Sequence, residues 1–324
     1  MATQLNPALA RLWIADNARQ YGYRQALQIK DLTEPQQRLL DFFELGITSA
    51  QRRDLPALAK TDNSEITKLE KRLQPALWIS STGIEPSEVE KRFSEIARML
   101  LQGSDPTEIK ARRKASSIFI ETLDATGLTI AKALSLAGIG KQISLDQKRV
   151  ASSDISELGY LPAQLGLPRV RAANALVGTD MQLHSRLSSS FDQISIAILI
   201  ATDVVSPASY QIWLARDVPH LSIVFDEEGV EVSPLVVPGK TSCLSCYEKY
   251  RLENLANWPV IAPQLLALER SLADSAMLLF ASGVVVNQVL NYLDLLKYEP
   301  LSLRLDRSGQ IASFIPPASN CGCR

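Results

Sequence analysis

The stretch SIFIETLDATGLTIAKALSLAGIGKQISLD, residues 117–146, determines the fold class. It begins with a short run of β-branched and aromatic residues, and this run predicts a strand over 116–121. Apolar residues then recur at helical spacing as far as Gly138, and a second strand is predicted over 142–146. A strand, a helix and a strand in succession are typical of a βαβ unit with parallel strands.

The same alternation continues toward the C-terminus. The run ISIAILIATD, residues 194–203, is almost entirely apolar, as expected for a strand in the middle of a parallel sheet that is covered on both faces. HLSIVF, residues 220–225, predicts another strand, and residues 301–315 predict a hairpin around Ser308–Gly309. The predicted fold is therefore α/β, with a Rossmann-like doubly wound sheet.

The N-terminal quarter of the chain has a different pattern, in which short strands flank three helical segments. Thr33 and Asn63 are the predicted N-caps of two of these helices. The predicted strands are ARLWIA, QALQIK and ALWIS, and the predicted helices are TEPQQRLLDFFE, SAQRRDLPALAK and NSEITKLEKRLQPA. This pattern predicts a winged-helix-like α+β module over 1–82. A helical connector over 83–112 and the Rossmann-like domain over 113–324 follow it.

Charge and hydropathy argue against several classes of partner. The chain has 34 Lys plus Arg and 35 Asp plus Glu, so we expect no general attraction to nucleic acid or to anionic membranes. The basic run KARRK, residues 110–114, is predicted to be a solvated helix end or a domain junction. The uncharged run 275–293 contains Asn287, Gln288 and Asn291, and these amides favour a buried helix over a membrane span. The first residues show no apolar signal segment, so a cytoplasmic location is expected.

Four cysteines occur in two close pairs, Cys243 with Cys246 and Cys321 with Cys323. Two thiolates from one turn fill two corners of a tetrahedron, so the two pairs predict a structural zinc site in a C-terminal zinc-binding subdomain. A redox CxxC and free core thiols are the alternatives. The redox reading is less favoured, because no strand followed directly by a CxxC at a helix start is predicted.

The loop after the first strand of the Rossmann-like domain has lost glycines that such a loop uses to approach phosphates. Gly127 stands at the third glycine position, which serves helix packing, whereas Thr122 and Asp124 stand at the first two. Asp146 follows the second strand, where an acid usually meets a ribose, and Asp203 ends the apolar strand at the ligand-binding edge of the sheet. Either acid could instead be an ordinary turn residue.

The order of these features resembles the ThiF/MoeB family, which is related to ubiquitin-activating enzymes. The resemblance covers residues 113–324, and the motifs that carry it are the glycine loop, LAGIG, ISLD, LGLPRVRAANAL, ILIATD and the two cysteine pairs. Members of the family adenylate the C-terminal carboxylate of a small protein with ATP and magnesium. They often carry a zinc site made by two cysteine pairs, and they commonly form homodimers.

With its N-terminal module, the chain is most similar to one branch of this family, the ThiF-like proteins of thiazole/oxazole-modified peptide and bacteriocin pathways. This resemblance implies a precursor (leader) peptide as ligand and a separate YcaO-type cyclodehydratase as partner. The N-terminal module would capture the leader by adding it to a sheet edge, for which QALQIK and ALWIS are the candidate strands.

The departures from the family pattern predict a degenerate nucleotide site with no catalytic residue. Lys148 replaces a second acid, Asp154 stands in the place of an asparagine that grips ATP, and Arg169 replaces a lysine. The resemblance leaves Gly127, Asp146, Arg169 and Asp203 as a vestigial nucleotide site. With all four cysteines used by the two pairs, none is spare for a thioester.

Two other functions are open. One is an ATP-dependent adenylyltransferase, in which Asp146, Asp203 and Arg169 would contact ribose, magnesium and phosphate. The other is a DNA-binding regulator that uses the winged helix, which the near-neutral charge disfavours.

Overall fold

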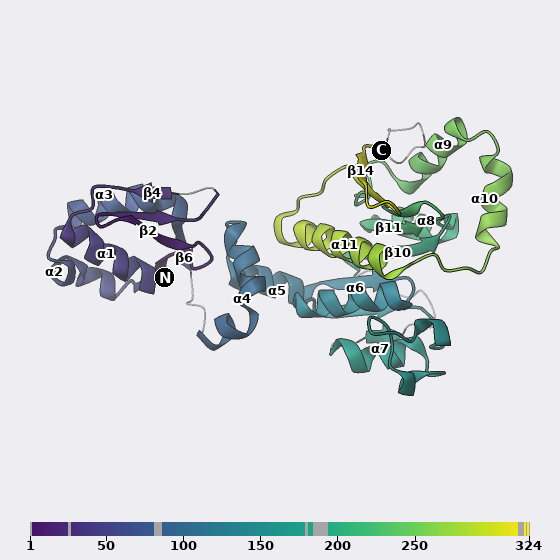
Figure 1. Ribbon diagram of the computed structural model, residues 1–324, viewed down its shortest axis with the longest axis horizontal. Helices are drawn as coiled ribbons and strands as arrows, with labels where there is room; N and C mark the ends of the chain where they lie inside the picture. Colours follow the sequence, from purple (N-terminus) through teal and green to yellow (C-terminus); the bar gives the residue numbers. More distant parts are fainter. Residues whose placement is uncertain are drawn as a thin grey trace. The chain divides into compact units, whose positions relative to one another are not determined.

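The computed structural model describes residues 2–24, 27–80, 86–178, 181–183, 194–316, 321 and 323. The chain divides into two compact units, Met1–Ala111 and Arg112–Arg324, shown in Figure 1. Each unit has a hydrophobic core of its own.

The first unit combines two three-stranded antiparallel sheets with short helices. One sheet has the order β5-β1-β6 and the other the order β2-β3-β4, so β6 and β4 are edge strands. The strands are β1 (Ala2–Leu5), β2 (Arg11–Ala15), β3 (Ala18–Tyr21), β4 (Leu27–Ile29), β5 (Ile47–Thr48) and β6 (Leu77–Ser80). The helices that pack beside the sheets are α1 (Glu34–Leu45), α2 (Leu55–Ala59) and α3 (Asn63–Leu73).

The helix starts in this unit follow capping chemistry, with one correction. Thr33 caps α1 as predicted, and its hydroxyl accepts a hydrogen bond from the amide of Gln36. The predicted cap Asn63 is wrong, because Asn63 is the first helical residue and Asp62 caps α3 by accepting from the Glu65 amide at 2.9 Å. Both residue types cap well, so only the backbone conformation distinguishes them.

The segment after β6 forms two helices. They are α4 (Pro86–Leu101) and α5 (Pro106–Ala115), and the chain turns between them at Gly103, whose φ is +74°. A left-handed backbone of this kind favours glycine, and Pro106 then opens the next helix. The predicted helix 49–60 is also shorter than expected, because a 3-10 turn at Gln51–Arg53 precedes α2.

The second unit is built on an eight-stranded sheet with the order β14-β13-β12-β11-β10-β7-β8-β9. The five strands from β9 to β11 are parallel and the remaining three are antiparallel. The strands are β7 (Ser117–Ile120), β8 (Lys141–Ser144), β9 (Met181–Leu183), β10 (Ile196–Thr202), β11 (His220–Phe225), β12 (Gly229–Val232), β13 (Ser302–Asp306) and β14 (Ile311–Phe314). The strand order reverses between β7 and β10, where ligands bind in doubly wound folds.

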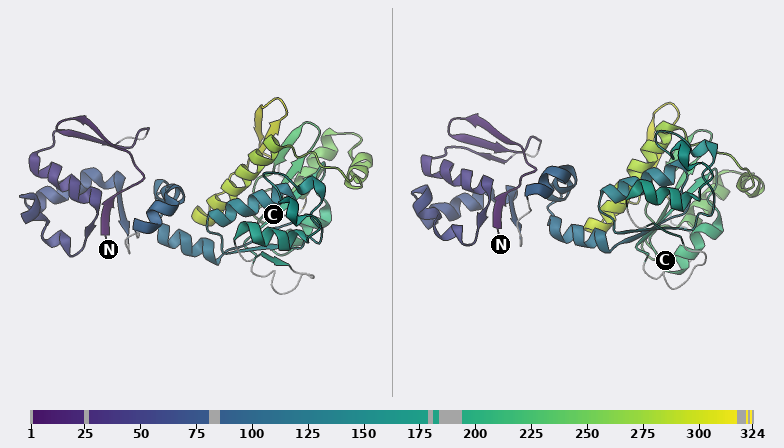
Figure 2. Two further views of the ribbon diagram at one scale, coloured as in Figure 1. Left: turned by 60° about the horizontal axis from the view of Figure 1, so that its bottom comes forward. Right: turned by 90° about the horizontal axis from the view of Figure 1, so that it is seen from below.

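Helices cover both faces of the parallel part of this sheet, as Figure 2 shows. On the central strand β10, Ile196, Ile198 and Ile200 join one core cluster, whereas Ala197 and Leu199 join the other. The first cluster is covered by α6 (Ala125–Leu136), α7 (Arg169–Val177) and α11 (Ser275–Leu295), and the second by α8 (Pro207–Ala215) and α9 (Leu244–Asn254). This arrangement confirms the predicted doubly wound α/β fold.

The long apolar helix α11 packs against this sheet and against α6. It is long and apolar enough to cross a membrane by length and composition. However, a stripe of its side chains that includes Met277, Ala281, Val285 and Val289 is buried in the core of the second unit. The structure therefore accounts for its hydropathy as that of a core helix.

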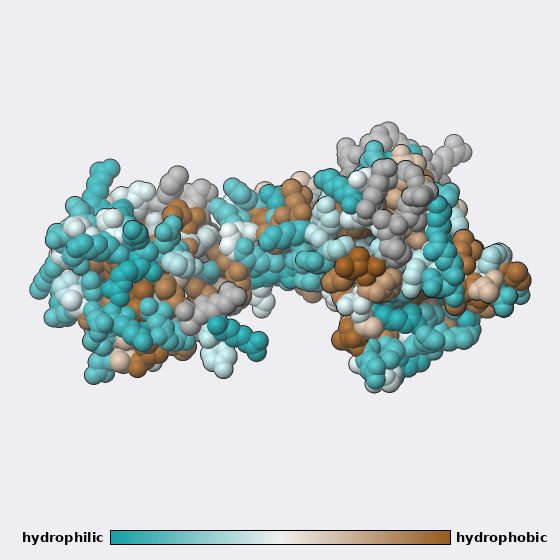
Figure 3. All heavy atoms as spheres, turned by 90° about the horizontal axis from the view of Figure 1, so that it is seen from above, coloured by the Kyte–Doolittle hydropathy of each residue, from teal (hydrophilic) through white to brown (hydrophobic). Residues whose placement is uncertain are grey.

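The helix α10 (Trp258–Leu266) buries little of its apolar surface within its own unit. Trp258 is its one buried residue, and the indole N–H donates to Glu248 at 2.8 Å. Val260, by contrast, is 65% exposed. Figure 3 shows apolar residues, in brown, at the right-hand end of the second unit, where α10 lies in Figure 1.

The basic run 110–114 lies at the end of α5, where Arg112 and Lys114 are exposed and Arg113 is buried. Arg113 is fully buried, and its guanidinium binds the Asp294 carboxylate, with an Nε to Oδ1 distance of 2.9 Å, and the Ala137 carbonyl. Arg112 donates to the carbonyl of Asp294 at 2.7 Å and so caps the end of α11. The solvated interpretation is therefore wrong for Arg113, because the partners come from α11 and from the end of α6.

Candidate functional site

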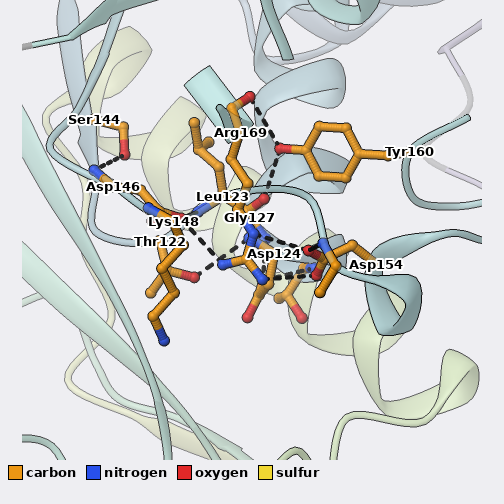
Figure 4. Close-up of polar contacts among 12 residues, drawn as sticks. Thr122, Leu123, Asp124, Gly127, Ser144, Asp146, Lys148, Asp154, Tyr160 and Arg169 are labelled. Carbon is orange, nitrogen blue, oxygen red and sulfur yellow. Dashed lines mark hydrogen bonds and ion pairs between the residues drawn. The ribbon is translucent and has the colours of Figure 1, made fainter. Parts of the chain in front are cut away.

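The carboxylate of Asp124 occupies the start of α6, at the edge of the sheet where the strand order reverses. One of its oxygens, Oδ1, accepts hydrogen bonds from the amides of Thr126 and Gly127, both at 3.0 Å, as Figure 4 shows. The first amides of a helix are unpaired and carry partial positive charge, so they form a ready anion site. Here the chain's own carboxylate fills that site.

Gly127 is required by close packing of the helix against the loop. A Cβ atom at this position would lie 1.9 Å from the carbonyl oxygen of Thr122. No side chain could be accommodated without moving backbone, which agrees with the packing role that the sequence assigns to this glycine.

Arg169 binds two of the acids that the sequence places near a nucleotide. Its guanidinium donates to Asp154 at 2.8 and 3.0 Å and to Asp146 at 3.2 Å (Figure 4). All three side chains are largely buried. Asp146 also accepts from the amides of Leu123 and Lys148, both at 2.8 Å. Three of the roughly four acceptor positions of the Asp146 carboxylate are therefore already used within the protein.

The charges in this cluster are unfavourable for a polyphosphate. Burial raises the pKa of Asp124, although the amides of Gly127 and Thr126 oppose that shift. Burial lowers the pKa of Arg169, but hydrogen bonds to Asp154 and attraction to Asp146 outweigh this and leave the pKa raised. One guanidinium thus faces two bound carboxylates and the nearby Asp124. An added phosphate would meet like charge, and the Arg169 guanidinium is already paired with two carboxylates.

Asp203 belongs to a separate ion-pair cluster. It follows β10 in a left-handed conformation, with φ at +63°, and its carboxylate is bound by Arg270 in a bidentate pair at 2.8 and 2.9 Å. Arg270 also binds Glu227 at 3.0 Å. Sequence reasoning missed Arg270, because it lies 67 residues from Asp203 in a segment without a motif.

The four cysteines converge at the start of α9. Their sulfur atoms all lie within 4.8 Å of one another, and the close pairs are separated by 3.3 to 3.9 Å. A tetrahedral Zn²⁺ with Zn–S bonds of about 2.3 Å needs sulfur atoms about 3.8 Å apart, so the cluster fits such an ion. A disulfide needs about 2.05 Å, and all four cysteines are free.

The expectation that no strand runs directly into the CxxC agrees with the structure, since β12 ends at Val232, well before Cys243. Cys243 is the N-cap of α9 and Cys246 lies in its first turn, so the pair does open a helix. A helix start stabilises a thiolate, which suits metal ligation as well as redox chemistry. The presence of Cys321 and Cys323 beside the pair favours the metal, since a redox pair needs only two thiols. Burial raises the pKa of Cys243 to about 12, so deprotonation there depends on a nearby cation.

No protein-family model and no curated protein matches the sequence, but solved structures match the fold. The structure of E. coli MccB with ATP superimposes with a TM-score of 0.71 over 100% of this chain and 99% of that one, at 10% sequence identity. The chain has the fold of MccB. The structure of MccB with the MccA peptide gives a TM-score of 0.68 at 12% identity, covering 99% of this chain and 98% of that one. PaaA gives 0.64 at 15% identity, covering 84% of this chain and 97% of that one.

This likeness confirms, at the level of fold, the resemblance to ThiF/MoeB-like proteins. MccB is described as a microcin C7 biosynthetic enzyme and has been crystallised with ATP and with MccA. The match extends over both units of this chain, whereas the resemblance seen in the sequence covers only residues 113–324. The winged-helix description of the first unit stays a prediction.

Proposed function

We propose that this chain is a ThiF-like protein of peptide modification that binds a precursor (leader) peptide and presents it to a separate modifying enzyme, such as a YcaO-type cyclodehydratase. In this proposal it does not itself use ATP. The observation that carries the second statement is the Asp124 carboxylate on the first amides of α6, where a nucleotide phosphate would sit.

A second feature of the same sheet edge supports a site without ATP. An adenylating enzyme needs a divalent cation near the transferred phosphates, and an acid at the end of β10 is the expected ligand. Here the guanidinium of Arg270 binds both oxygens of that acid, Asp203. A cation would have to displace this bidentate pair before it could bind, and bidentate charge-assisted pairs are the stronger kind.

The first unit offers a place for an extended peptide. A hollow of about 810 Å³ lies beside the edge strand β6 and the beginning of β4. Its lining includes Tyr23, Leu77, Trp78, Ile79 and Leu101. Ile79 is 62% exposed, and the indole N–H of Trp78 has no hydrogen-bond partner among the described residues. An edge strand beside an aromatic and aliphatic hollow supports capture by strand addition, in which backbone bonds give affinity and the hollow gives selectivity.

We also propose that the cysteine cluster holds a structural zinc ion. Four thiolates complete a tetrahedron, so the ion would have no open position for substrate or water. It would fix Cys321 and Cys323, near the C-terminus, to the start of α9.

The test of the ATP statement is calorimetry of the full chain with ATP and magnesium. We expect no saturable heat from the native protein, and clear saturable binding would overturn this part of the proposal. The variant Asp124→Gly frees the two amides, and we expect it to gain measurable affinity for inorganic phosphate. Asp41→Gly is the control, because Asp41 is an exposed aspartate of the first unit, outside this edge.

The test of peptide capture uses synthetic candidate leader peptides. Ile79→Pro removes a backbone donor from β6, and we expect it to abolish binding of any leader that the native chain binds. Ile14→Pro is the matched control, since Ile14 is also exposed (42%) and also lies on an edge strand, β2, outside the lining of the hollow. Equal loss of binding in both variants would contradict the assignment to β6.

An ATP-dependent adenylyltransferase is the second candidate, and it is favoured by one observation. A chain of this fold, E. coli MccB, has been crystallised with ATP, and Asp146 and Asp203 remain at the corresponding sheet edge here. A pyrophosphate-exchange assay with candidate peptides separates the two functions, because only the adenylyltransferase would catalyse exchange.

A further inference from the structure

A second cavity lies in the Rossmann-like unit, on the face of α11 that carries amide side chains. Its volume is about 250 Å³. Val284, Asn287, Gln288, Asn291 and Leu295 line it from α11, at spacings that place them on one face of the helix. The opposite wall is formed by Leu235 and by the segment that enters β13, with Lys297, Tyr298, Glu299, Leu301 and Leu303.

Gln288 presents an acceptor that the fold leaves open. Its Nε2 donates to the Ser233 carbonyl at 3.4 Å, which orients the carboxamide. Its Oε1 is buried and has no hydrogen-bond partner among the described residues. A buried acceptor without a partner is unfavourable, so a ligand that brings an N–H donor to it is favoured.

The size and chemistry of the cavity restrict the occupant. It is smaller than the pockets of drug-sized ligands, which are about 300–1,000 Å³, so it suits one large amino-acid side chain. Five of its eleven lining residues are aliphatic, namely Leu235, Val284, Leu295, Leu301 and Leu303, and they favour an apolar side chain. Amide side chains pair well with peptide groups, because both offer one N–H donor face and one carbonyl acceptor. Lys297 and Glu299 carry opposite charges, so a charged ligand of either sign gains little.

We infer that this cavity is a second peptide-binding site, which holds one apolar side chain of an extended polypeptide while a backbone N–H of that polypeptide donates to Gln288 Oε1. The polypeptide is the precursor peptide, and only this last identification rests on the proposed function. The precursor peptide would then have two contacts on this chain, its leader at β6 and a downstream residue at this cavity.

The cavity is tested by two-dimensional NMR titration of the full chain with N-acetyl-L-leucinamide, which supplies one apolar side chain and two peptide groups. We expect saturable shifts, and binding of N-acetylglycinamide at least tenfold weaker because it lacks the side chain. Val284→Phe fills the cavity and abolishes the binding. Gln288→Leu removes the acceptor and weakens it about tenfold, which is what one neutral hydrogen bond supports.

Two matched controls keep the test specific. Val260→Phe and Gln264→Leu make the same changes on α10, outside the cavity, and leave the titration unchanged. Unaltered binding in Val284→Phe, or no saturable shift with native protein, overturns the inference. So does binding of 3-methylbutan-1-ol as tightly as the blocked leucine, because that alcohol has the side chain without the peptide groups.

The identification of the polypeptide is tested separately. We expect Val284→Phe to weaken binding of a candidate leader-plus-core peptide about tenfold and to leave binding of the isolated leader unchanged. Equal affinity of Val284→Phe and native protein for the longer peptide overturns the identification. If no candidate leader binds the chain, the proposed function fails, while the titration with blocked leucine still decides whether the cavity binds peptide groups.

Discussion

At the scale of single residues, charged side chains of the protein itself occupy positions that phosphate and a metal ion would occupy in a nucleotide site. Asp124 puts a carboxylate on the amides of α6, and Arg270 puts a guanidinium on Asp203. Each partner is satisfied by hydrogen bonds within the protein, so a ligand gains only the difference between its own contacts and those it displaces. The loss of two loop glycines is thus accompanied by a rearrangement of charge, which is a stronger argument than the altered motif alone.

Arg113 provides a prediction about stability. The Arg113–Asp294 pair is fully buried, and removing one partner leaves a charge in the core without a counter-ion. We expect Arg113→Ala to lower the free energy of unfolding of the second unit by about 3–5 kcal/mol in chemical denaturation. Lys114→Ala changes the exposed neighbour and should cost less than about 0.5 kcal/mol. A similar decrease in the free energy of unfolding for both variants would mean that the Arg113–Asp294 pair does not stabilise the second unit.

His220 provides a prediction about pH. The ring is fully buried, its Nδ1 lies 2.9 Å from the Val218 carbonyl, and burial lowers its pKa to about 4. In the unfolded chain His220 binds a proton near pH 6.5, whereas in the folded chain it binds one only near pH 4. The contribution of the neutral, buried His220 to the free energy of unfolding is therefore complete above pH 6.5. It is lost as the pH falls from 6.5 toward 4.

The loss in the free energy of unfolding caused by His220 over this pH range is about 3 kcal/mol, at 1.36 kcal/mol for each unit of difference between the folded and unfolded pKa. We expect His220→Gln, which does not titrate, to lose less stability than the native chain between pH 7 and pH 4.5, as measured by urea unfolding. Parallel pH profiles for the two proteins would show that His220 does not contribute. The comparison cancels the titration of groups common to both proteins.

At the scale of elements, the start of α9 depends on residues that are distant in sequence. Cys243 caps the helix and Cys246 lies in its first turn, whereas Cys321 and Cys323, which lie beside them, come from the last few residues of the chain. The hairpin β13–β14 leads the chain back toward α9, and Phe314 of β14 packs its ring against Tyr247 and Tyr250 of that helix. Packing of the hairpin against α9 therefore helps to place the second cysteine pair beside the first.

The cysteine cluster predicts one equivalent of bound zinc. We expect metal analysis of the native chain to give about one zinc per chain and Cys246→Ser to lose it, because three thiolates bind zinc less tightly than four. Ser245→Ala, one residue away, should keep the metal. Zinc retained in Cys246→Ser, or absent from freshly purified native protein, would contradict the assignment.

At the scale of the whole molecule, the two units have separate hydrophobic cores and separate candidate sites. The core of the first unit includes Leu39, Phe43 and Leu69, and the cysteine cluster lies entirely in the second. In the proposed function, the first unit would hold the leader and the second unit would hold a downstream residue of the same precursor peptide. Regulation or specificity could then change in one unit without disturbing the core of the other.

Calorimetry should reveal this division as two unfolding transitions. We expect a zinc chelator to lower the transition temperature of the second unit and to leave the first unit unchanged, because ligand binding stabilises only the unit that it touches. Arg113→Ala should shift the same transition as the chelator. A single transition that shifts as a whole would show that the two units unfold cooperatively.

The sequence by itself determined the α/β order of the Rossmann-like unit, the helix start at Thr33 and the grouping of the cysteines. These features depend on neighbours in the chain: hydrophobic periodicity, a capping side chain at Thr33, two thiols in one turn at Cys243 and Cys246. The family resemblance also identified Asp146, Arg169 and Asp203 as residues of a vestigial nucleotide site. It could not assign their partners.

Only the tertiary structure decided how the charges pair. Arg270 reaches Asp203 across 67 residues, and Arg113 reaches Asp294 across 181. No local pattern specifies such a pair, because its energy depends on burial and on distances that exist only after the sheet and helices have packed. The same reason explains why the amides of α11 could be interpreted as signs of burial from sequence, whereas the cavity that they line became visible only in the folded chain.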